Sequence, residues 1–463
     1  MSEKLGQTAQ HFLAKAEDRS LVAGVIGLGY VGLPLAIETA RSGFRTLGFD
    51  VDPQLVGEVN QGRSHILDVS SAELAEWVES GRLVATADMQ RLAECDALMI
   101  CVPTPLSKIK DPDLSYVVQA ADQIRQSLRP GQLVVLESTT YPGTTREVVL
   151  DRLIGSSLEA GQDFFLCYSP ERVDPGNPIW KTRNTPKIIG GLTEHCLTVG
   201  RALYDQIFET IVPVTSPEAA ELAKVYENTF RMINIALANE LAQACDKLGV
   251  DVWEVIEAAG TKPFGFMKFT PGPGLGGHCI PLDPHYLSWK MRTLAFKTRL
   301  IELASEINAE MPYFVVSKIS EALNDQGHPV KGSCILVVGV SYKRDIDDLR
   351  ESPAMEIVRR LEQMGGRIEY HDPYCPVMEI EGPDHLPERR LESVSLTPQR
   401  VQAAQAVVIV TDHSKLDYQL ILDHAQVVID TRGVTRSMKG RARVVSLSGA
   451  AQRSGSPEAL TTG

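Results

Sequence analysis

The sequence predicts an α/β protein in which two units of alternating strands and helices are joined by a long central helix. The first observation is a glycine-rich segment, Gly27 to Gly32, between an apolar run and a helical pattern. The second is a similar alternation that restarts after Gly332. The third is a helical pattern of about thirty residues between them, far longer than a usual helix. Strands that alternate with helices are typical of a parallel sheet covered by helices.

The composition is that of a globular protein with an acidic surface. Of 463 residues, 43% are hydrophobic and 23% are charged, and the formal net charge is −13. This charge disfavours nucleic acids and anionic membranes as partners. No stretch approaches the roughly 20 apolar residues of a membrane helix. The eight cysteines form no CxxC pair, so we expect a cytoplasmic protein without disulfides and without a bound metal.

The segment that opens the first unit is typical of a dinucleotide-binding Rossmann fold. An apolar strand from Leu21 to Ile26 leads into Gly27, Gly29 and Gly32, and a helical pattern follows. Gly27 permits the tight turn, Gly29 lets a pyrophosphate approach the backbone, and Gly32 lets helix and strand pack closely. A dinucleotide is therefore the expected ligand.

An acid at the end of the second strand favours NAD over NADP. The strand from Arg45 to Phe49 ends at Asp50. This carboxylate suits an adenosine ribose and would repel a 2′-phosphate, although a solvated acid is the alternative interpretation. Tyr30 and Val31 begin the intervening helix, whose N–H groups we expect to face the cofactor phosphates.

Three further apolar runs predict strands that carry polar residues at their carboxyl ends. They span residues 96–105, 132–139 and 164–171. Ligands of an open parallel sheet lie beyond the carboxyl ends of its strands. We therefore expect Pro103, Thr104, Thr139 and Glu171 to border the ligand site.

The long helical pattern has clear start and stop signals. Ser216 is a suitable N-cap, Pro217 suits the first helical position, and Gly249 suits the exit. Within it, Lys224 and Asn228 are four residues apart and share a face. They either belong to a site or form an exposed polar stripe. A helix of this length usually connects domains or forms a subunit interface.

The segment "PGPGLGGHCIPLD", from Pro271 to Asp283, packs glycines around Cys279. A buried structural cysteine needs no such setting, although free cysteines are often simply buried. A thiol that must meet a bulky substrate at close range benefits from neighbours without side chains. The segment therefore predicts a functional thiol.

These motifs resemble the UDP-glucose/GDP-mannose dehydrogenase superfamily. In chain order they are "GLGYVGLPLA", "VPTP", "ESTTYPGTT", "YSPERVDPGN", "LAKVYENTFRMINIALANE", "PGPGLGGHCIPLDPHYL" and "GVSYKRDIDDLRESPA". The resemblance extends from about Leu21 to about Gly433. It is strongest to the branch that acts on UDP-N-acetylhexosamines, UDP-N-acetylglucosamine above all.

The resemblance implies a domain organisation and an assembly. Read from its residues alone, the second α/β unit lacks the glycine fingerprint and binds a different nucleotide or none. The resemblance makes it the UDP-sugar-binding domain and implies a homodimer or higher homo-oligomer. The implied parts are an N-terminal extension (1–20), a Rossmann NAD-binding domain (21–215), a central helical domain with the cysteine loop and the dimerisation helix (216–312), a Rossmann-like UDP-sugar-binding domain (313–449) and a disordered tail (450–463).

The resemblance also implies a reaction. The C6 hydroxyl of a nucleotide sugar is oxidised to the uronate, which removes four electrons and so requires two NAD and one water. Cys279 captures the aldehyde as a thiohemiacetal, which becomes a thioester. We expect Gly274, Gly276 and Gly277 to leave room for sugar and nicotinamide beside the sulfur. The product would serve surface polysaccharide biosynthesis.

Five more catalytic residues follow from the resemblance. Lys224 stabilises negative charge on the reacting oxygen and, with Asp283, helps to remove the hydroxyl proton. Asn228 donates to the same oxygen. Thr139 positions the water, and Glu171 is the base for thioester hydrolysis.

The remaining implied residues bind the substrate or the cofactor. Many members of the family have a second glutamate where this chain has Pro175, so that role is absent or moves, for example to Asp174. The implied cofactor-binding residues beyond the glycine loop and Asp50 are Pro103, Thr104 and Arg350. The implied substrate-binding residues are Glu171, Arg172, Val173, Lys224, Asn228, Phe269, Gly274, Gly276, Gly277 and Lys343.

Three alternatives remain. The same chemistry could act on UDP-glucose, UDP-N-acetylmannosamine, UDP-N-acetylgalactosamine or GDP-mannose. A β-hydroxyacid dehydrogenase shares the fold and a helical lysine, but it needs neither Cys279 nor the residues beyond Gly332. A non-catalytic nucleotide-sugar sensor would not need the complete catalytic set.

Overall fold

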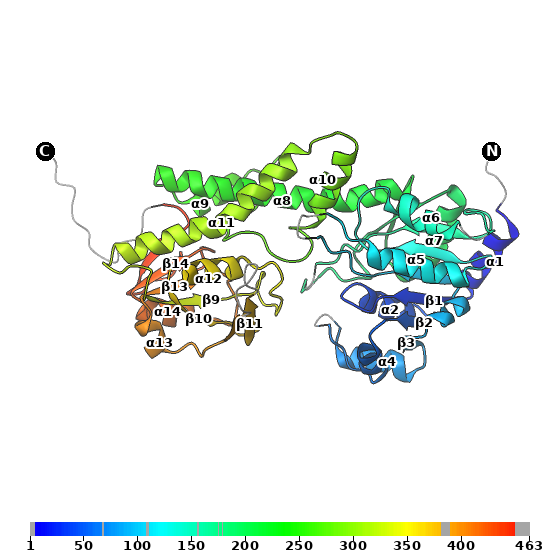
Figure 1. Cartoon of the computed structure of the whole chain (residues 1–463), viewed down its shortest axis with the longest axis horizontal. Coiled ribbons are helices and arrows are strands. Elements are labelled where there is room, and N and C mark those ends of the chain that lie inside the picture. The colour runs from blue at the N-terminus through cyan, green and yellow to red at the C-terminus, as the bar shows by residue number, and fades with distance from the viewer. Residues whose placement is uncertain are drawn as a thin grey trace. The chain divides into compact units, whose positions relative to one another are not determined.

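The structure is a computed structural model that describes residues 5–66, 69–107, 111–154, 157–174, 176–177, 179–380 and 389–449. It divides into two compact units (Figure 1). The first comprises Met1–Glu227 and Leu282–Lys297, and the second comprises Asn228–Pro281 and Thr298–Gly463. Pro175 and the tail predicted to be disordered lie outside the described residues. Within those ranges, no helix has both the length and the apolar character needed to cross a bilayer.

The first unit is built on a sheet that has eight strands in the described part of the chain. The strands lie in the order β3-β2-β1-β4-β5-β6-β7-β8. Their bounds are β1 Val22–Ile26, β2 Arg45–Phe49, β3 Leu83–Thr86, β4 Ala97–Ile100, β5 Leu133–Leu136, β6 Phe165–Tyr168, β7 Lys187–Gly191 and β8 Ile211–Val214. The predicted parallel sheet is confirmed with one exception, because β7 pairs with β6 in the antiparallel direction.

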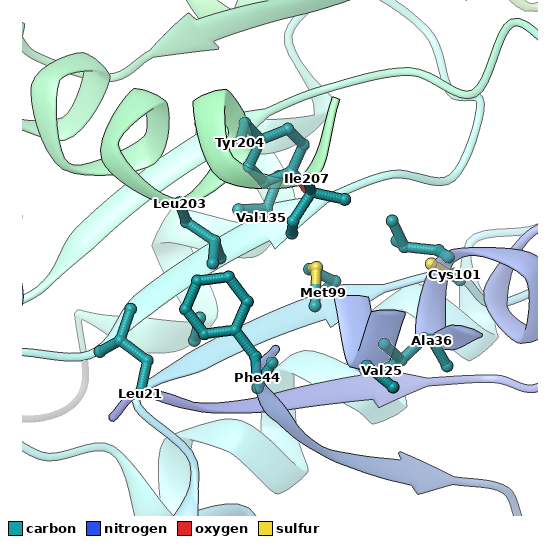
Figure 2. Packing of buried hydrophobic residues seen from close by; sticks show 14 of the residues in the cluster. Leu21, Val25, Ala36, Phe44, Met99, Cys101, Val135, Leu203, Tyr204 and Ile207 are labelled. Carbon is teal, nitrogen blue, oxygen red and sulfur yellow. The ribbon is translucent and has the colours of Figure 1, made fainter. Parts of the chain in front are cut away.

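Helices cover both faces of this sheet. Figure 2 shows side chains of α7 and α2 packed against side chains of β1, β4 and β5 on one face. On the other face, α5 buries Val117, Ala121 and Ile124 against the sheet. The helices of this unit are α1 Gln7–Glu17, α2 Gly32–Arg41, α3 Pro53–Asn60, α4 Ser71–Glu79, η1 Met89–Glu94, α5 Ser115–Ser127, η2 Thr145–Leu150, α6 Asp151–Leu153, α7 Glu194–Ile207 and α10 Asp283–Thr293.

The second unit repeats the α/β plan. Its described residues form a parallel five-stranded sheet in the order β10-β9-β13-β14-β15, together with the hairpin β11–β12. The strands are β9 Cys334–Val338, β10 Arg367–His371, β11 Val377–Ile380, β12 Arg389–Glu392, β13 Ala406–Ile409, β14 Val427–Asp430 and β15 Arg443–Ser446. The helices are α9 Val252–Gly260, α11 Arg299–Asn324, α12 Pro353–Gln363, α13 Pro398–Ala403 and α14 Tyr418–His424.

The long helix forms as its sequence signals predict. It is α8, Pro217–Leu248, and it contributes residues to both units. The Ser216 hydroxyl accepts a hydrogen bond from the Ala219 N–H at 3.2 Å, which caps the first turn. Gly249 leaves the helix with a φ of 69°, in the left-handed region that glycine tolerates.

Candidate active site

The candidate residues are distributed over both units. The first unit holds Gly27, Gly29, Tyr30, Val31, Gly32, Asp50, Pro103, Thr104, Thr139, Glu171, Arg172, Val173, Lys224 and Asp283. The second unit holds Asn228, Phe269, Gly274, Gly276, Gly277, Cys279, Lys343 and Arg350. Each set is described below within its own unit.

The glycine loop has the geometry that a pyrophosphate needs. Gly27 has a φ of 90°, and an added Cβ would lie 2.7 Å from the Cys101 carbonyl oxygen. A Cβ on Gly32 would lie 1.7 Å from the Gly27 carbonyl oxygen, so only glycine lets helix α2 approach the loop. At Gly29 no described atom lies within 4 Å of an added Cβ. The first and last glycines therefore shape the loop, and the middle one leaves its surface open, which fits NAD.

Asp50 is fixed at the end of β2. Its Oδ2 accepts from the Leu28 N–H at 2.9 Å, and its Oδ1 accepts from the Asp52 N–H at 3.1 Å. The carboxylate thus ties the strand end to the glycine loop. In its proposed role, Asp50 accepts ribose hydrogen bonds with the carboxylate lone pairs that these two bonds leave.

The loops after β4 and β5 are joined by hydrogen bonds. The Thr104 hydroxyl donates to the Thr139 carbonyl at 2.7 Å, and the Ser138 hydroxyl donates to the Val102 carbonyl at 2.7 Å. The Tyr286 hydroxyl of α10 donates to the Thr104 carbonyl. These bonds bring the candidate cofactor residue Thr104 next to the candidate water-positioning residue Thr139.

Glu171 follows β6 and is held as a carboxylate. Its Oε1 accepts from the N–H groups of Arg172 and Val173 at 2.7 and 2.8 Å, and its Oε2 lies 3.3 Å from Lys187 Nζ. Burial opposes ionisation, but Lys187, the two N–H groups and Lys224 together hold the pKa of Glu171 below its usual range. An ionised carboxylate is the state that a general base requires.

Sequence reasoning missed Lys187 and Glu137, which lie beside Glu171. Lys187 Nζ lies 2.6 Å from Glu137 Oε2, and the Tyr204 hydroxyl donates to the other oxygen of Glu137. Burial raises the pKa of Glu137 to about 7, and Glu171 adds to the rise, whereas Lys187 opposes it. A lysine at the start of an apolar run, "KIIGG", was the available signal.

Lys224 and Asp283 are both buried in the first unit. Lys224 is 8% exposed and lies close enough to Glu171 to lower its pKa. Asp283 begins α10 and is 4% exposed. Burial raises the pKa of Tyr168 well above its ordinary value, and the carboxylates of Glu221 and Asp283 contribute. The unit therefore gathers an ammonium and several carboxylates around the end of β6.

The cysteine loop of the second unit is anchored to two helices. The Gly272 N–H donates to Asn239 Oδ1 of α8 at 2.9 Å, and Asn239 in turn donates to Asn308 Oδ1 of α11 at 2.8 Å. Both asparagines are buried. Cys279 lies on this anchored loop and is partly exposed.

Packing within the protein explains why the positions before Cys279 are glycines. The expected explanation was room for the substrate. An added Cβ on Gly276 would lie 2.5 Å from Tyr342 Cβ, and one on Gly277 would lie 2.8 Å from the Tyr342 ring. The Gly277 N–H donates to the Arg350 carbonyl at 2.9 Å. The space that these missing side chains leave is filled by the protein itself. Substrate contacts of Gly274, Gly276 and Gly277 remain predictions.

The other cysteines are poor candidates for a nucleophile. Six are buried, and only Cys334 is partly exposed like Cys279. Burial is the main cause that raises the pKa of six of these seven thiols, namely Cys95, Cys101, Cys167, Cys245, Cys334 and Cys375. A raised pKa disfavours the reactive thiolate.

The remaining candidates of the second unit lie on segments that its own contacts order. Arg350 pairs with Asp348 through two nitrogens, the closer contact being 2.6 Å. The carbonyl of Lys343 accepts from the Ser341 hydroxyl at 2.7 Å. Phe269 packs edge-on against Phe230 of α8, with ring centroids 5.8 Å apart. Among the described residues, no cluster of His, Cys, Asp and Glu is arranged to hold a metal ion.

Comparison with known proteins finds one family along most of the chain. Three models of the UDP-glucose/GDP-mannose dehydrogenase family match it in order: the NAD binding domain at residues 22–208, the central domain at 218–310 and the UDP binding domain at 336–437. The chain belongs to the UDP-glucose/GDP-mannose dehydrogenase family. The NAD-binding domain indicates NAD as the cofactor.

Relatives within the UDP-glucose/GDP-mannose dehydrogenase family carry the names of different sugars. The chain is 38% identical over 361 residues to UDP-N-acetyl-D-glucosamine 6-dehydrogenase of Pseudomonas aeruginosa, covering 77% of this chain and 83% of that protein. It is 37% identical over 423 residues to NDP-N-acetyl-D-galactosaminuronic acid dehydrogenase of Ralstonia solanacearum, covering 89% and 95%. The solved structure of the UDP-D-ManNAc dehydrogenase of Pyrococcus horikoshii matches with a TM-score of 0.83 at 33% identity, covering 92% and 99%.

Proposed function

We propose that this family member catalyses the NAD-dependent four-electron oxidation of the C6 hydroxyl of UDP-N-acetylglucosamine to the uronate. The observation that carries the proposal is Glu171, held ionised at the carboxyl edge of the NAD-binding sheet within electrostatic reach of Lys224. A base for hydrolysis is needed only if oxidation passes beyond the aldehyde.

The first oxidation requires loss of the hydroxyl proton. Asp283 takes this proton with the help of Lys224, and the Lys224 ammonium and the Asn228 amide stabilise the oxygen as it gains negative charge. NAD, when bound by the glycine loop and Asp50, accepts the hydride in each of the two oxidations. The product of this step is an aldehyde.

The second oxidation and the hydrolysis use Cys279 and Glu171. The Cys279 thiolate adds to the aldehyde carbon and gives a thiohemiacetal, whose oxidation gives a thioester. Thr139 positions a water, Glu171 takes its proton, and cleavage of the carbon–sulfur bond releases the uronate and restores the thiolate. Overall, one alcohol, one water and two NAD give one carboxylate, two NADH and three protons.

The choice of sugar rests on the relatives. Several are named for UDP-N-acetylglucosamine, UDP-N-acetylmannosamine or N-acetylgalactosaminuronate, all of which carry an acetamido group. We assign UDP-N-acetylglucosamine first, with UDP-N-acetylmannosamine, UDP-N-acetylgalactosamine, UDP-glucose and GDP-mannose as alternatives. The product supplies surface polysaccharide synthesis in the cytoplasm, which agrees with eight free cysteines.

The assembly belongs to the same proposal. Helix α8 carries an exposed apolar stripe, which we define as Leu222, Tyr226, Phe230 and Leu237. Spacings of four and seven residues place these side chains on one face of the helix. We assign this stripe to the interface of a homodimer.

A substrate panel tests the proposed activity. The protein is mixed with NAD and each of the five nucleotide sugars, and NADH and the sugar product are quantified. We expect the highest kcat/KM with UDP-N-acetylglucosamine and two NADH for each uronate. A higher kcat/KM with another sugar would overturn the assignment of the sugar. Release of one NADH per sugar would overturn the four-electron reaction.

A further inference from the structure

The antiparallel pairing of β7 with β6 brings a lysine to the candidate active-site edge of the first sheet. Strand β7 pairs with β6 in the register Cys167↔Gly191 and Tyr168↔Gly190. The same register, continued along the chain, places Lys187 opposite Glu171. The amino end of β7 therefore lies where the parallel strands have their carboxyl ends, which is the edge where ligands bind.

Lys187 is shared by two carboxylates of very different exposure. Its Nζ lies 2.6 Å from Glu137 Oε2 and 3.3 Å from Glu171 Oε2. The side chains of Lys187 and Glu137 are 3% and 0% exposed, whereas that of Glu171 is 15% exposed. Only Glu171 therefore has an outlet to a bound water, and Glu137 serves as the inner partner of the ammonium.

The cluster holds one more acid than a simple ion pair. A buried ammonium with one carboxylate is already neutralised, and a second carboxylate adds a net negative charge that burial opposes. That excess charge is placed on the outer carboxylate, where the N–H groups of Arg172 and Val173 also point. Polar groups so arranged are typical of a site that keeps an acid ionised for chemistry.

We propose that Lys187, held in place by Glu137, is a positioning residue that keeps Glu171 ionised and correctly oriented as the base for thioester hydrolysis. The inference rests on the proposed function and extends it to two residues that do not touch the substrate. It makes different predictions for the two partners. Loss of the Lys187 charge raises the pKa of Glu171, whereas Glu137→Gln leaves it nearly unchanged, because Glu137 is already protonated at the pH where Glu171 titrates.

The charged neighbours of the pair enter this expectation. Lys187 and Lys224 favour the ionised form of Glu171. Lys187 and Tyr204 favour ionised Glu137, and Glu171 disfavours it. Since an opposite charge at this range shifts a carboxyl pKa by about 1 to 3 units, loss of the Lys187 charge gives a measurable shift. Glu137, whose pKa burial raises to about 7, is already protonated where Glu171 titrates.

The first measurement follows ionisation without substrate. The intact protein is labelled with a water-soluble carbodiimide and an amine, which modify protonated carboxyls, over a series of pH values. Peptide mass spectrometry then gives the pH midpoint for Glu171. We expect Lys187→Met to raise this midpoint by about 1 to 3 pH units, and we expect Glu137→Gln and Lys187→Arg to retain it.

The matched control is Lys15→Met. Lys15 forms an equally short pair, 2.6 Å, with the buried Asp96, at the amino end of β4 and so at the opposite edge of the sheet. This variant should leave the Glu171 midpoint unchanged. Thermal unfolding of each variant identifies any that fails to fold, and Glu137→Gln and Lys187→Arg, which preserve side-chain shape or charge, then test the pairing, because neither should move the midpoint.

The second measurement is the pH profile of kcat with the best sugar of the panel. The base acts only when ionised, so activity falls as the pH drops through the pKa of Glu171. The acid limb should therefore move to higher pH in Lys187→Met and stay in place in Glu137→Gln. A shifted labelling midpoint in Lys187→Met without turnover on any sugar would support the pairing and contradict the proposed function. An unshifted midpoint in Lys187→Met, or an equal rise in Glu137→Gln, would overturn the pairing.

Discussion

Glu171 combines three features that a surface carboxylate lacks, namely two backbone donors, a buried lysine partner and a small exposed area. Each backbone donor fixes the carboxylate plane, and the ammonium offsets the cost of burial. At the scale of one residue, this arrangement favours proton removal from a water over proton donation.

The first prediction concerns this base. Glu171→Gln keeps the size of the side chain but cannot accept a proton, so hydrolysis should slow more than either oxidation. Enzyme mixed with substrate and NAD should then accumulate a covalent sugar adduct on Cys279, detected by intact mass and peptide mapping. Glu209→Gln, a substitution of an exposed acid of the same unit, should form no adduct. Full turnover by Glu171→Gln would exclude Glu171 as the base.

Sequence reasoning found Glu171 and missed Lys187, for a physical reason. Glu171 follows an apolar run, and the carboxyl end of a strand is visible in the local pattern. Lys187 belongs to the site only because β7 is antiparallel to β6. The direction of a strand within a sheet is set by tertiary packing, and a run of apolar residues has the same pattern in either direction.

In the glycine loop, Gly32 and Gly29 have different roles, packing and open space, although one sequence motif contains both. Gly32 lies against the Gly27 carbonyl, while the space beyond Gly29 is open among the described atoms. The packing role of Gly32 is confirmed, because the turn and the following helix are local, and the pyrophosphate contact of Gly29 stays a prediction. The contact of Gly276 and Gly277 with Tyr342 was not predicted, because Tyr342 is distant in sequence, and the substrate contacts of these glycines stay predictions.

The second prediction uses this contrast. Gly32→Ala should lower the free energy of unfolding by about 1–3 kcal/mol or more, since its Cβ has no room. Gly29→Ala should leave unfolding nearly unchanged and weaken NAD binding roughly tenfold, or about 1.4 kcal/mol, because its methyl group obstructs the pyrophosphate. Chemical denaturation and calorimetric titration of NAD measure the two effects. Wild-type NAD affinity in Gly29→Ala would contradict the proposed position of the pyrophosphate.

Some strands lack the signal that sequence analysis needs. Strand β8, Ile211–Val214, contains Pro213 and lies at the edge of the sheet. Proline is tolerated there because an edge strand leaves backbone donors unpaired. The start and end of α8 were predicted correctly, since Ser216, Pro217 and Gly249 act through local capping.

At the scale of the whole molecule, the exposed stripe of α8 is the feature that folding of one chain does not explain. Tyr226 and Leu237 are 65% and 62% exposed, and large apolar side chains in a row are typical of an interface. Such an interface accounts for the unusual length of α8. Its first turns contribute Lys224 to one unit, and its later turns hold the cysteine loop through Asn239.

The third prediction tests this interface. Tyr226→Glu and Leu237→Glu should convert a dimer to a monomer, because a carboxylate buried at an apolar interface is strongly unfavourable. Light scattering after size exclusion gives the mass of each variant. Tyr116→Glu, which changes an exposed tyrosine of α5, should retain the dimer. A wild-type mass equal to one chain, or a dimer in both stripe variants, would exclude the stripe as the interface.

Capture of the aldehyde by Cys279 is the step on which the four-electron reaction depends, and the number of NADH released per sugar measures whether it occurs. Cys279→Ser keeps the shape of the side chain but replaces a good nucleophile by a poor one. Cys334→Ser is the matched control, because Cys334 is the other partly exposed cysteine. We predict that the control releases two NADH per sugar, and that Cys279→Ser binds NAD and sugar but releases no more than one. Near-normal release of two NADH by Cys279→Ser would contradict the account.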